Sequence, residues 1–274
     1  MQFINKLIKE NEDEGNAIVE TFMAGQWQDD SQRYVNLDYD GFSGRRSEMV
    51  KLTVKEQDNF CCYCMRLITD DNATLEHVIP NKTSSLAEFD KYSYVDILKE
   101  KVVFWTRSYN DIKQFTPPFP HMIAYYNLVA SCNGGIYDYD QKNIERKITL
   151  NQCCNSPRGK KEIKLLFYFA DIEERISYTK DGDISVDEDM EDTIEILNLN
   201  HKSLKRIREA WHFISKKFTV NDVKVAIDNP DLRDDILSEM PYSIAVDPTL
   251  YTDIYWNLLY QYNWFYKYYH DNFQ

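Results

Sequence analysis

The sequence predicts an α+β fold in which a small centre of strands and one helix is embedded between two helical regions. Three observations predict it. All six cysteines lie between residues 61 and 154, strand-like segments surround them, and helix-like segments fill both ends of the chain. We therefore expect an N-terminal helical region at 1–59, a core with insertions at 60–190, and a C-terminal helical region at 191–274.

The composition is typical of a folded intracellular protein. The chain has 274 residues, of which 43% are hydrophobic, enough for a real core. No apolar run approaches the roughly 18 to 20 residues that a membrane span requires, and the first residues do not form a cleavable signal. We expect a cytoplasmic protein without membrane contact. In that reducing compartment, clustered cysteines indicate metal binding rather than disulfides, the alternative being a scatter of buried free thiols.

The net charge of −13 is unfavourable for holding nucleic acid by bulk charge. The charge is uneven, however, because Arg158, Lys160, Lys161 and Lys164 form a local basic patch. A second basic run spans 201–208. These patches favour phosphate contact with help from a partner, and the alternative is that charges of both signs coat an ordinary soluble surface.

Before the centre, the pattern predicts a helix at 3–24 that ends near Gly25, an irregular loop at 27–46 and a helix at 47–59. Within the centre it predicts strands at 72–79 and 125–131, which are separated by an insertion.

After the centre, we expect a helix from Ser156, because Pro157 suits a first turn, and strands at 164–169 and 175–178. The residues 179–183 predict a hairpin turn into a further strand. The rest reads as helix, interrupted near 198–201. The aromatic residues of the C-terminal segment indicate either a docking surface or rings packed on the protein's own body, and we favour the second.

The cysteines predict a structural zinc site. Cys61 and Cys64 have the spacing of a metal-binding turn, and zinc needs two further ligands near a tetrahedron. Cys132 and Cys154 flank the second strand and the start of the helix, which can bring them beside the first pair. The 21 residues between them depart from a compact second pair, but a longer loop adds little to the cost of closure. Two further thiols, Cys62 and Cys153, remain alternative ligands.

Glu76 and His77 at the end of the first strand suit phosphodiester hydrolysis. A neutral imidazole can take a proton from water near pH 7, and a carboxylate can hold a hard ion such as Mg²⁺. Asn155 offers a neutral oxygen ligand, and Asn127 on the paired strand could hold the loop that orients His77. A Glu-His pair alone is more often an ordinary surface pair.

The ordered set resembles the HNH, or ββα-metal, endonuclease superfamily. More narrowly, it is similar to the nuclease subunit of Septu-type two-gene anti-phage systems, some of them associated with retrons. The similar stretches cover about 47–215 and are Glu56-Gln57, Cys61-Cys62-Tyr63-Cys64, Ala73-Thr74-Leu75-Glu76-His77, 127–135, 153–160 and 197–201.

The resemblance implies a role for each matched position. His77 would be the general base and Asn127 the orienting residue, while Glu76 and Asn155 would bind catalytic Mg²⁺ or Mn²⁺. The structural Zn²⁺ would be held by Cys61, Cys64, Cys132 and Cys154. Arg158, Lys160 and Lys161 would contact nucleic acid. Many relatives carry His at the position of Asn155 and Lys at that of Arg158, which are two departures.

We therefore expect a metal-dependent endonuclease, with DNA favoured as substrate, acting as the effector of an anti-phage complex. The resemblance also implies an ABC- or SMC-like ATPase partner. One alternative is a zinc-stabilised subunit that binds nucleic acid or a partner without catalysis. A purely structural subunit of a defence complex and a nuclease that cuts RNA, such as tRNA, are the others.

Overall fold

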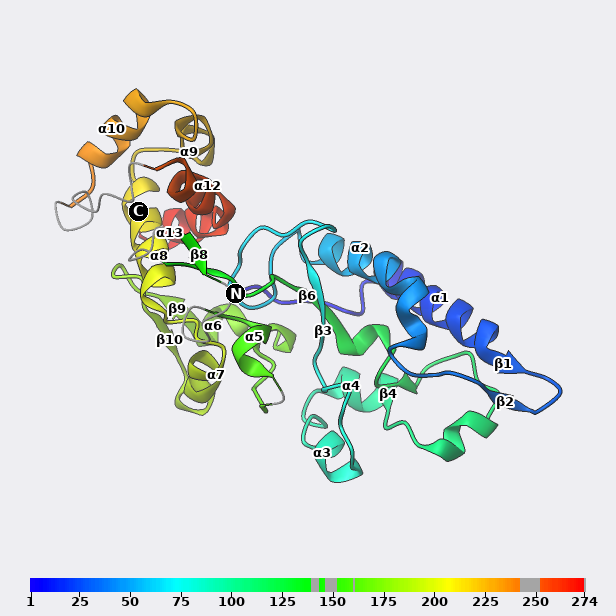
Figure 1. The fold of residues 1–274 in the computed structure, drawn as a ribbon. Helices are drawn as coiled ribbons and strands as arrows, with labels where there is room; N and C mark the ends of the chain where they lie inside the picture. Colours follow the sequence, from blue (N-terminus) through cyan, green and yellow to red (C-terminus); the bar gives the residue numbers. More distant parts are fainter. Residues whose placement is uncertain (139–142, 146–151, 160, 242–251, 274) are drawn as a thin grey trace. The chain divides into compact units, whose positions relative to one another are not determined.

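The computed structural model describes residues 1–138, 143–145, 152–159, 161–241 and 252–273. It is a mixed helix-and-strand protein, and the strands within the described ranges pair in twos (Figure 1). Contacts divide the chain into two units. The histidine unit comprises 3–59 and 69–131, and the cysteine unit comprises 1–2, 60–68 and 132–274. This grouping in space runs across the three predicted regions, whose division into domains stays a prediction.

Two helices form the N-terminal part of the histidine unit. Helix α1 (Lys9–Gln26) starts later than predicted, because the preceding Ile8 has an extended backbone. The expected irregular loop contains instead a short hairpin of β1 (Trp27–Gln28) and β2 (Arg33–Tyr34), followed by the 3-10 helix η1 (Gly41–Arg45). Helix α2 (Arg46–Glu56) confirms the second predicted helix and packs against α1.

The two predicted strands of the centre are confirmed. Strand β3 (Thr74–His77) pairs antiparallel with β6 (Leu128–Ser131), with His77 opposite Leu128 (Figure 1). All four residues of β6 are buried. The amide of Gln57 pairs with both backbone groups of Ala130, at 2.8 and 2.7 Å, so the end of α2 is fastened to β6. The residues just before β6 form the 3-10 helix η3 (Tyr125–Asn127).

The insertion between β3 and β6 folds into short elements of the same unit. They are α3 (Leu86–Asp90), α4 (Asp96–Lys101), β4 (Val102–Val103), η2 (Arg107–Asp111) and β5 (Phe119–Pro120). Strands β4 and β5 pair in parallel, and the His121 N–H continues their ladder by donating to the Val103 carbonyl. The insertion is thus tied to itself immediately before β6 begins.

The first part of the cysteine unit corrects two expectations. It contains β7 (Ile136–Asp138), β8 (Asn143–Glu145), α5 (Asn155–Arg158), η5 (Leu166–Tyr168) and α6 (Ile172–Arg175). The helix expected from Ser156 is only the four residues of α5, because Gly159 follows with a φ of 53°. The strand expected at 164–169 is absent from these described residues, which form η5 instead.

The hairpin and helix break that follow are confirmed. Strands β9 (Ile176–Tyr178) and β10 (Ile184–Val186) pair antiparallel across the predicted turn. After η6 (Glu188–Met190), helices α7 (Glu191–Ile196) and α8 (Lys202–Ile214) are separated at the predicted position. His201 caps α8 by accepting a hydrogen bond from the Ser203 N–H.

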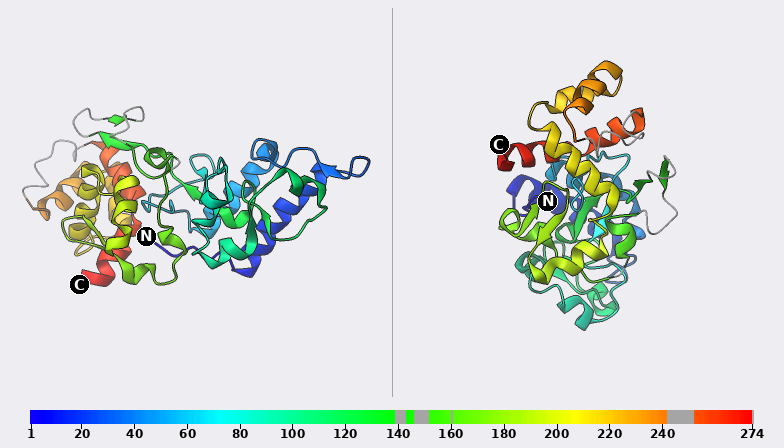
Figure 2. Two further views of the ribbon diagram at one scale, coloured as in Figure 1. Left: turned by 90° about the horizontal axis from the view of Figure 1, so that it is seen from below. Right: turned by 90° about the vertical axis from the view of Figure 1, so that its left-hand side faces the viewer.

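Helices complete the cysteine unit, and α8 packs against the last of them (Figures 1 and 2). They are α9 (Val220–Ala226), α10 (Pro230–Ser238), α12 (Asp253–Gln261) and α13 (Trp264–Phe273). The C-terminal aromatic rings are mostly interior: Tyr255, Trp256, Tyr262, Phe265 and Tyr269 are at most 2% exposed. Packing on the protein's own body is therefore confirmed for these rings. No helix in the described ranges is long and apolar enough to cross a membrane.

Candidate functional site

Four cysteines of the cysteine unit form a group that could bind a metal such as zinc. The sulfur atoms of Cys61, Cys64, Cys132 and Cys154 all lie within 4.8 Å of one another, and all four residues are buried. Individual separations are 3.8 Å for Cys61 to Cys154, 3.8 Å for Cys64 to Cys132 and 3.6 Å for Cys132 to Cys154. A tetrahedron with Zn–S bonds of about 2.3 Å requires sulfur separations of about 3.8 Å. The spacing therefore fits zinc with four cysteine ligands.

The first two ligands sit on a tight turn. Phe60 and Leu67 form an isolated antiparallel bridge, and the Cys61 N–H donates to the Arg66 carbonyl at 2.8 Å. Met65 closes the turn with a φ of 60°, a conformation that side chains other than glycine adopt only at a cost. This closed turn places both sulfur atoms on the same side.

The other two ligands are brought together by a second bridge. Gly135 pairs with Gln152, and the Cys153 N–H donates to the Gly134 carbonyl at 2.9 Å. The two ends of the long connection between Cys132 and Cys154 are therefore held next to each other. Cys154 has a φ of 61°, and its N–H donates to the Leu197 carbonyl. A strained cysteine held by its backbone is typical of a site with a function.

Cys62 and Cys153 lie outside the tetrahedral group. Both are buried, and the Cys153 sulfur is 3.4 Å from that of Cys154. Burial raises the pKa of the Cys64 and Cys154 thiols well above the usual range, because a thiolate is costly in a low dielectric. A bound divalent cation would supply the charge that lets these ligands ionise.

The cysteine turn is also the anchor of the C-terminal helices. The Leu67 N–H donates to the Gln261 carbonyl at 2.6 Å, and the Arg66 Nε donates to the Gln261 side chain at 2.7 Å. Trp211 on α8 donates to the Leu259 carbonyl at 3.0 Å. The turn that carries Cys61 and Cys64 is therefore hydrogen-bonded to the end of α12.

The predicted basic patch is only partly exposed. Arg158 is 1% exposed, and its Nη1 donates to the Tyr63 hydroxyl at 3.0 Å, so it braces the cysteine turn. A guanidinium buried in this way is poorly placed for a phosphate. Lys161 is exposed, and Lys160 lies outside the described residues.

The second basic run is largely structural. Arg208 is buried and donates to the Leu199 carbonyl at 2.9 Å, and Lys205 pairs with Asp183 at 2.8 Å. These contacts favour the alternative for this run, in which its charges serve folding and solubility rather than substrate binding.

His77 ends β3 with its imidazole held by the backbone. Its Nε2 lies 2.9 Å from the Met122 carbonyl oxygen. Because a carbonyl can only accept, Nε2 carries the ring proton, and Nδ1 is the basic nitrogen of the neutral ring. The role of His77 as a general base stays a prediction.

Asn127 fastens the loop behind His77. It is fully buried, its Oδ1 accepts from the Ile79 N–H at 2.7 Å, and its Nδ2 donates to the carbonyls of Ile79 and His121 at 2.9 and 2.6 Å. Asn127 therefore ties together the backbone at Ile79 and His121, and its orienting role stays a prediction. Burial lowers the pKa of the adjacent His121 to about 4, so this imidazole stays neutral.

Two residues near His77, Tyr39 and Arg46, were not predicted from the sequence. The Tyr39 ring meets the His77 ring edge-on, with centroids 4.4 Å apart, and the Arg46 guanidinium lies 3.8 Å from the Tyr39 centroid. Burial, opposed by Arg46 and assisted by Glu76, raises the pKa of Tyr39. Glu76 and His77 therefore both reach the surroundings of Tyr39, although neighbouring residues alternate along a strand. The only signal in the sequence was an aromatic residue in a polar loop.

The predicted ligand Asn155 belongs to the cysteine unit, whereas Glu76 belongs to the histidine unit. The metal-binding role of these two residues stays a prediction. Among the residues that the structure describes, the four cysteines are the only group of three or more His, Cys, Asp and Glu side chains that could hold a metal.

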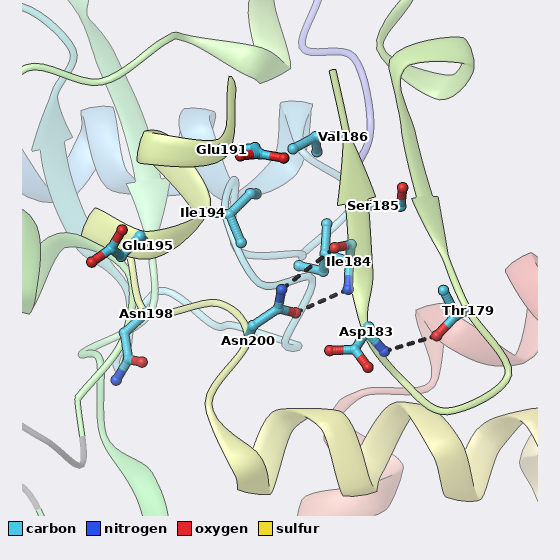
Figure 3. Close-up of a pocket in the computed structure, with 10 residues that line it drawn as sticks. All are labelled: Thr179, Asp183, Ile184, Ser185, Val186, Glu191, Ile194, Glu195, Asn198 and Asn200. Atoms are coloured by element: carbon cyan, nitrogen blue, oxygen red, sulfur yellow. Dashed lines mark hydrogen bonds between the residues drawn. The ribbon is translucent and has the colours of Figure 1, made fainter. Parts of the chain in front are cut away.

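A cavity of about 440 Å³ lies in the cysteine unit beside β10 and α7 (Figure 3). Asp183, Glu191 and Glu195 line it, and the Asn200 amide pairs with the backbone of Ile184 at its wall. Three carboxylates disfavour a phosphate. Neither His77 nor Asn127, the predicted catalytic residues, lines this cavity.

Comparisons with protein-family models, with curated proteins and with solved structures find no match for this chain. The geometry of its own residues is therefore what supports a function.

Proposed function

We propose that this chain is a metal-dependent endonuclease of the HNH type that hydrolyses phosphodiester bonds, with DNA as the favoured substrate. The observation that carries the proposal is the setting of His77. Its imidazole ends a strand, its Nε2 donates to a backbone carbonyl, and a buried asparagine fixes the loop that supplies this carbonyl. The order of motifs along the chain supports the same reading.

In the proposed reaction, His77 Nδ1 takes a proton from water, and the resulting hydroxide attacks the phosphorus. Orientation by the Met122 carbonyl keeps the basic nitrogen in place, and general-base catalysis of this kind typically contributes 10²- to 10⁴-fold. Glu76 would hold Mg²⁺ or Mn²⁺. When bound, such an ion supplies charge relief at the phosphate and at the leaving 3′ oxygen.

The cysteine group has a structural role in this proposal. Four buried thiolates around zinc leave no open position for a substrate, as in other closed zinc sites. The anti-phage role and the ATPase partner rest on the resemblance of the motifs alone, and they remain part of the proposal.

The test compares wild type with His77→Ala on labelled plasmid DNA and on total tRNA. Each is incubated with Mg²⁺ or Mn²⁺, with and without the proposed ATPase partner. We expect wild type to cleave and His77→Ala to lose at least about 10²-fold in rate. His270→Ala is the matched control, because His270 is half exposed and contacts the surface residue Asp271.

Circular dichroism and zinc content establish that the variants fold. Full activity of a folded His77→Ala variant would contradict the proposal. Zinc in the purified wild type without cleavage under any condition would favour a binding module. Cleavage of tRNA alone would keep the nuclease and change its substrate to RNA.

A further inference from the structure

We propose that Arg46 binds a phosphate of the nucleic-acid backbone at the His77 site, and that Tyr39 positions Arg46 there. This inference rests on the proposed nuclease function and adds to it a substrate-binding cation. Arg46 lies at the start of α2, 31 positions before His77 in the sequence, and in the same unit.

The first support is a series of contacts that links three side chains. The Arg46 guanidinium lies over the Tyr39 ring at 3.8 Å from its centroid, and that ring meets His77 at 81° with centroids 4.4 Å apart. A cation on an aromatic face is attracted by the ring electrons and loses freedom of orientation. Tyr39 therefore holds a guanidinium at a fixed place close to the proposed base.

The second support is the incomplete pairing of the guanidinium. Arg46 Nη2 donates to the Tyr39 carbonyl, and its contact with Asp40 is 3.4 Å long to a carboxylate whose side chain is 99% exposed. Arg46 Nε is buried without a hydrogen-bond partner. A guanidinium has five N–H donors in a planar fork that suits phosphate oxygens. Because the side chain is 34% exposed, an anion can reach it.

The third support is the need for a local cation. The net charge of −13 opposes a polyanion, and the Arg158 guanidinium is buried against Tyr63. Arg46 contacts the Tyr39 ring, which in turn meets the ring of the proposed base. A donor that meets the developing charge of the phosphate typically contributes 10²- to 10³-fold to the rate.

The neighbouring Arg45 offers a matched control. Arg45 ends the 3-10 helix η1, one residue before Arg46, and its Nη1 pairs with Glu48 at 2.8 Å. Arg45→Ala removes the same charge from the chain without touching Tyr39. It therefore separates a specific phosphate contact from a general effect of net charge.

The first measurement is kcat/KM for cleavage of the substrate that wild type cuts. We expect Arg46→Ala to lower it about 10²- to 10³-fold and Arg45→Ala to change it less than about 3-fold. Arg46→Lys should recover part of the loss, because it keeps the charge but not the fork. Tyr39→Leu should resemble Arg46→Ala, whereas Tyr39→Phe should stay near wild type.

The second measurement separates binding from structure. In a His77→Ala background, fluorescence anisotropy gives the affinity for a labelled oligonucleotide across a salt series. We expect Arg46→Ala to reduce the slope of log affinity against log salt by about 1, and Arg45→Ala to leave it unchanged. If Arg46→Ala loses its circular dichroism spectrum, Arg46→Gln replaces it in both measurements, because glutamine keeps much of the side chain.

Unchanged cleavage and an unchanged salt slope in folded Arg46→Ala would overturn this inference, and inactive His77→Ala in the same assay would leave the nuclease standing. Equal losses in Arg45→Ala and Arg46→Ala would also overturn it. Absence of cleavage by wild type would overturn both proposals, and it is seen before any Arg46 variant is compared.

Discussion

At the scale of single residues, the buried amide of Asn127 does the most for the proposed site. Its side chain closes three hydrogen bonds to the backbone around Ile79 and His121, and the residue after His121 supplies the carbonyl that holds His77. One side chain thus joins the end of β3 to the insertion that precedes β6.

Asn127→Ala should destabilise the fold and slow cleavage together. Removing the amide leaves three buried backbone groups without partners, each costing roughly 1 to 3 kcal/mol. We expect the free energy of unfolding to fall by about 3 kcal/mol or more, measured by denaturation followed with circular dichroism. The control is Asn72→Ala, whose exposed side chain accepts one bond from the Thr69 N–H and should cost less than about 1 kcal/mol. Equal losses in the two variants would contradict the role of Asn127.

The sequence could predict the group of four cysteines because its members belong to motifs of adjacent residues. It could not predict Tyr39 or Arg46, because Tyr39 packs against His77, more than thirty positions later, and Arg46 in turn packs on Tyr39. Arg158 shows the opposite failure. Its place in a basic cluster indicated phosphate binding, whereas its burial against Tyr63 depends on the folded chain.

At the scale of elements, β3, β6, α2 and the β9–β10 hairpin could be predicted because local signals determine them. The α5 helix was predicted too long because Gly159 ends it after four residues, which the pattern of apolar residues did not reveal. The sequence of the insertion before β6 did not indicate that this segment contacts His77. The segment supplies the Met122 carbonyl to His77, and Met122 lies two residues after β5, which pairs with β4.

The turn that carries Cys132 depends on Gly134. This residue has a φ of 75°, and a Cβ there would lie 2.4 Å from Ser156 Oγ and 2.6 Å from the Cys153 carbonyl oxygen. The hydroxyl could rotate away, but the backbone carbonyl could not without moving Cys154.

Gly134→Ala should therefore weaken the metal site. Backbone strain alone costs about 1 to 2 kcal/mol, and displacement of Cys154 adds to it. We expect faster loss of zinc to a coloured chelator than in wild type. Gly44→Ala is the control, because a Cβ at Gly44 meets nothing within 4 Å. Equal rates of zinc loss in the two variants would show that the turn tolerates a side chain.

At the scale of the whole molecule, the two units have different means of support. The histidine unit is held by the α1–α2 pair, the β3–β6 pair and buried polar contacts such as Lys6 with Glu56. The cysteine unit has short strands. Its cysteine turn carries two members of the four-cysteine group and the hydrogen bonds to Gln261 of α12. Metal loss should therefore affect the two units unequally.

We expect removal of zinc to unfold the cysteine turn and release α12 while α1 and α2 stay folded. A structural zinc contributes on the order of 10 kcal/mol, more than the hydrogen bonds around Gln261 can replace. Hydrogen exchange of the full chain, reduced and treated with a chelator, should show lost protection at 60–68, 153–158 and 253–262. Protection within α1 and α2 should change little. Added zinc should restore protection in the three segments of the cysteine unit. A uniform loss across both units, or none, would mean that the cysteine group does not support its own unit in this way.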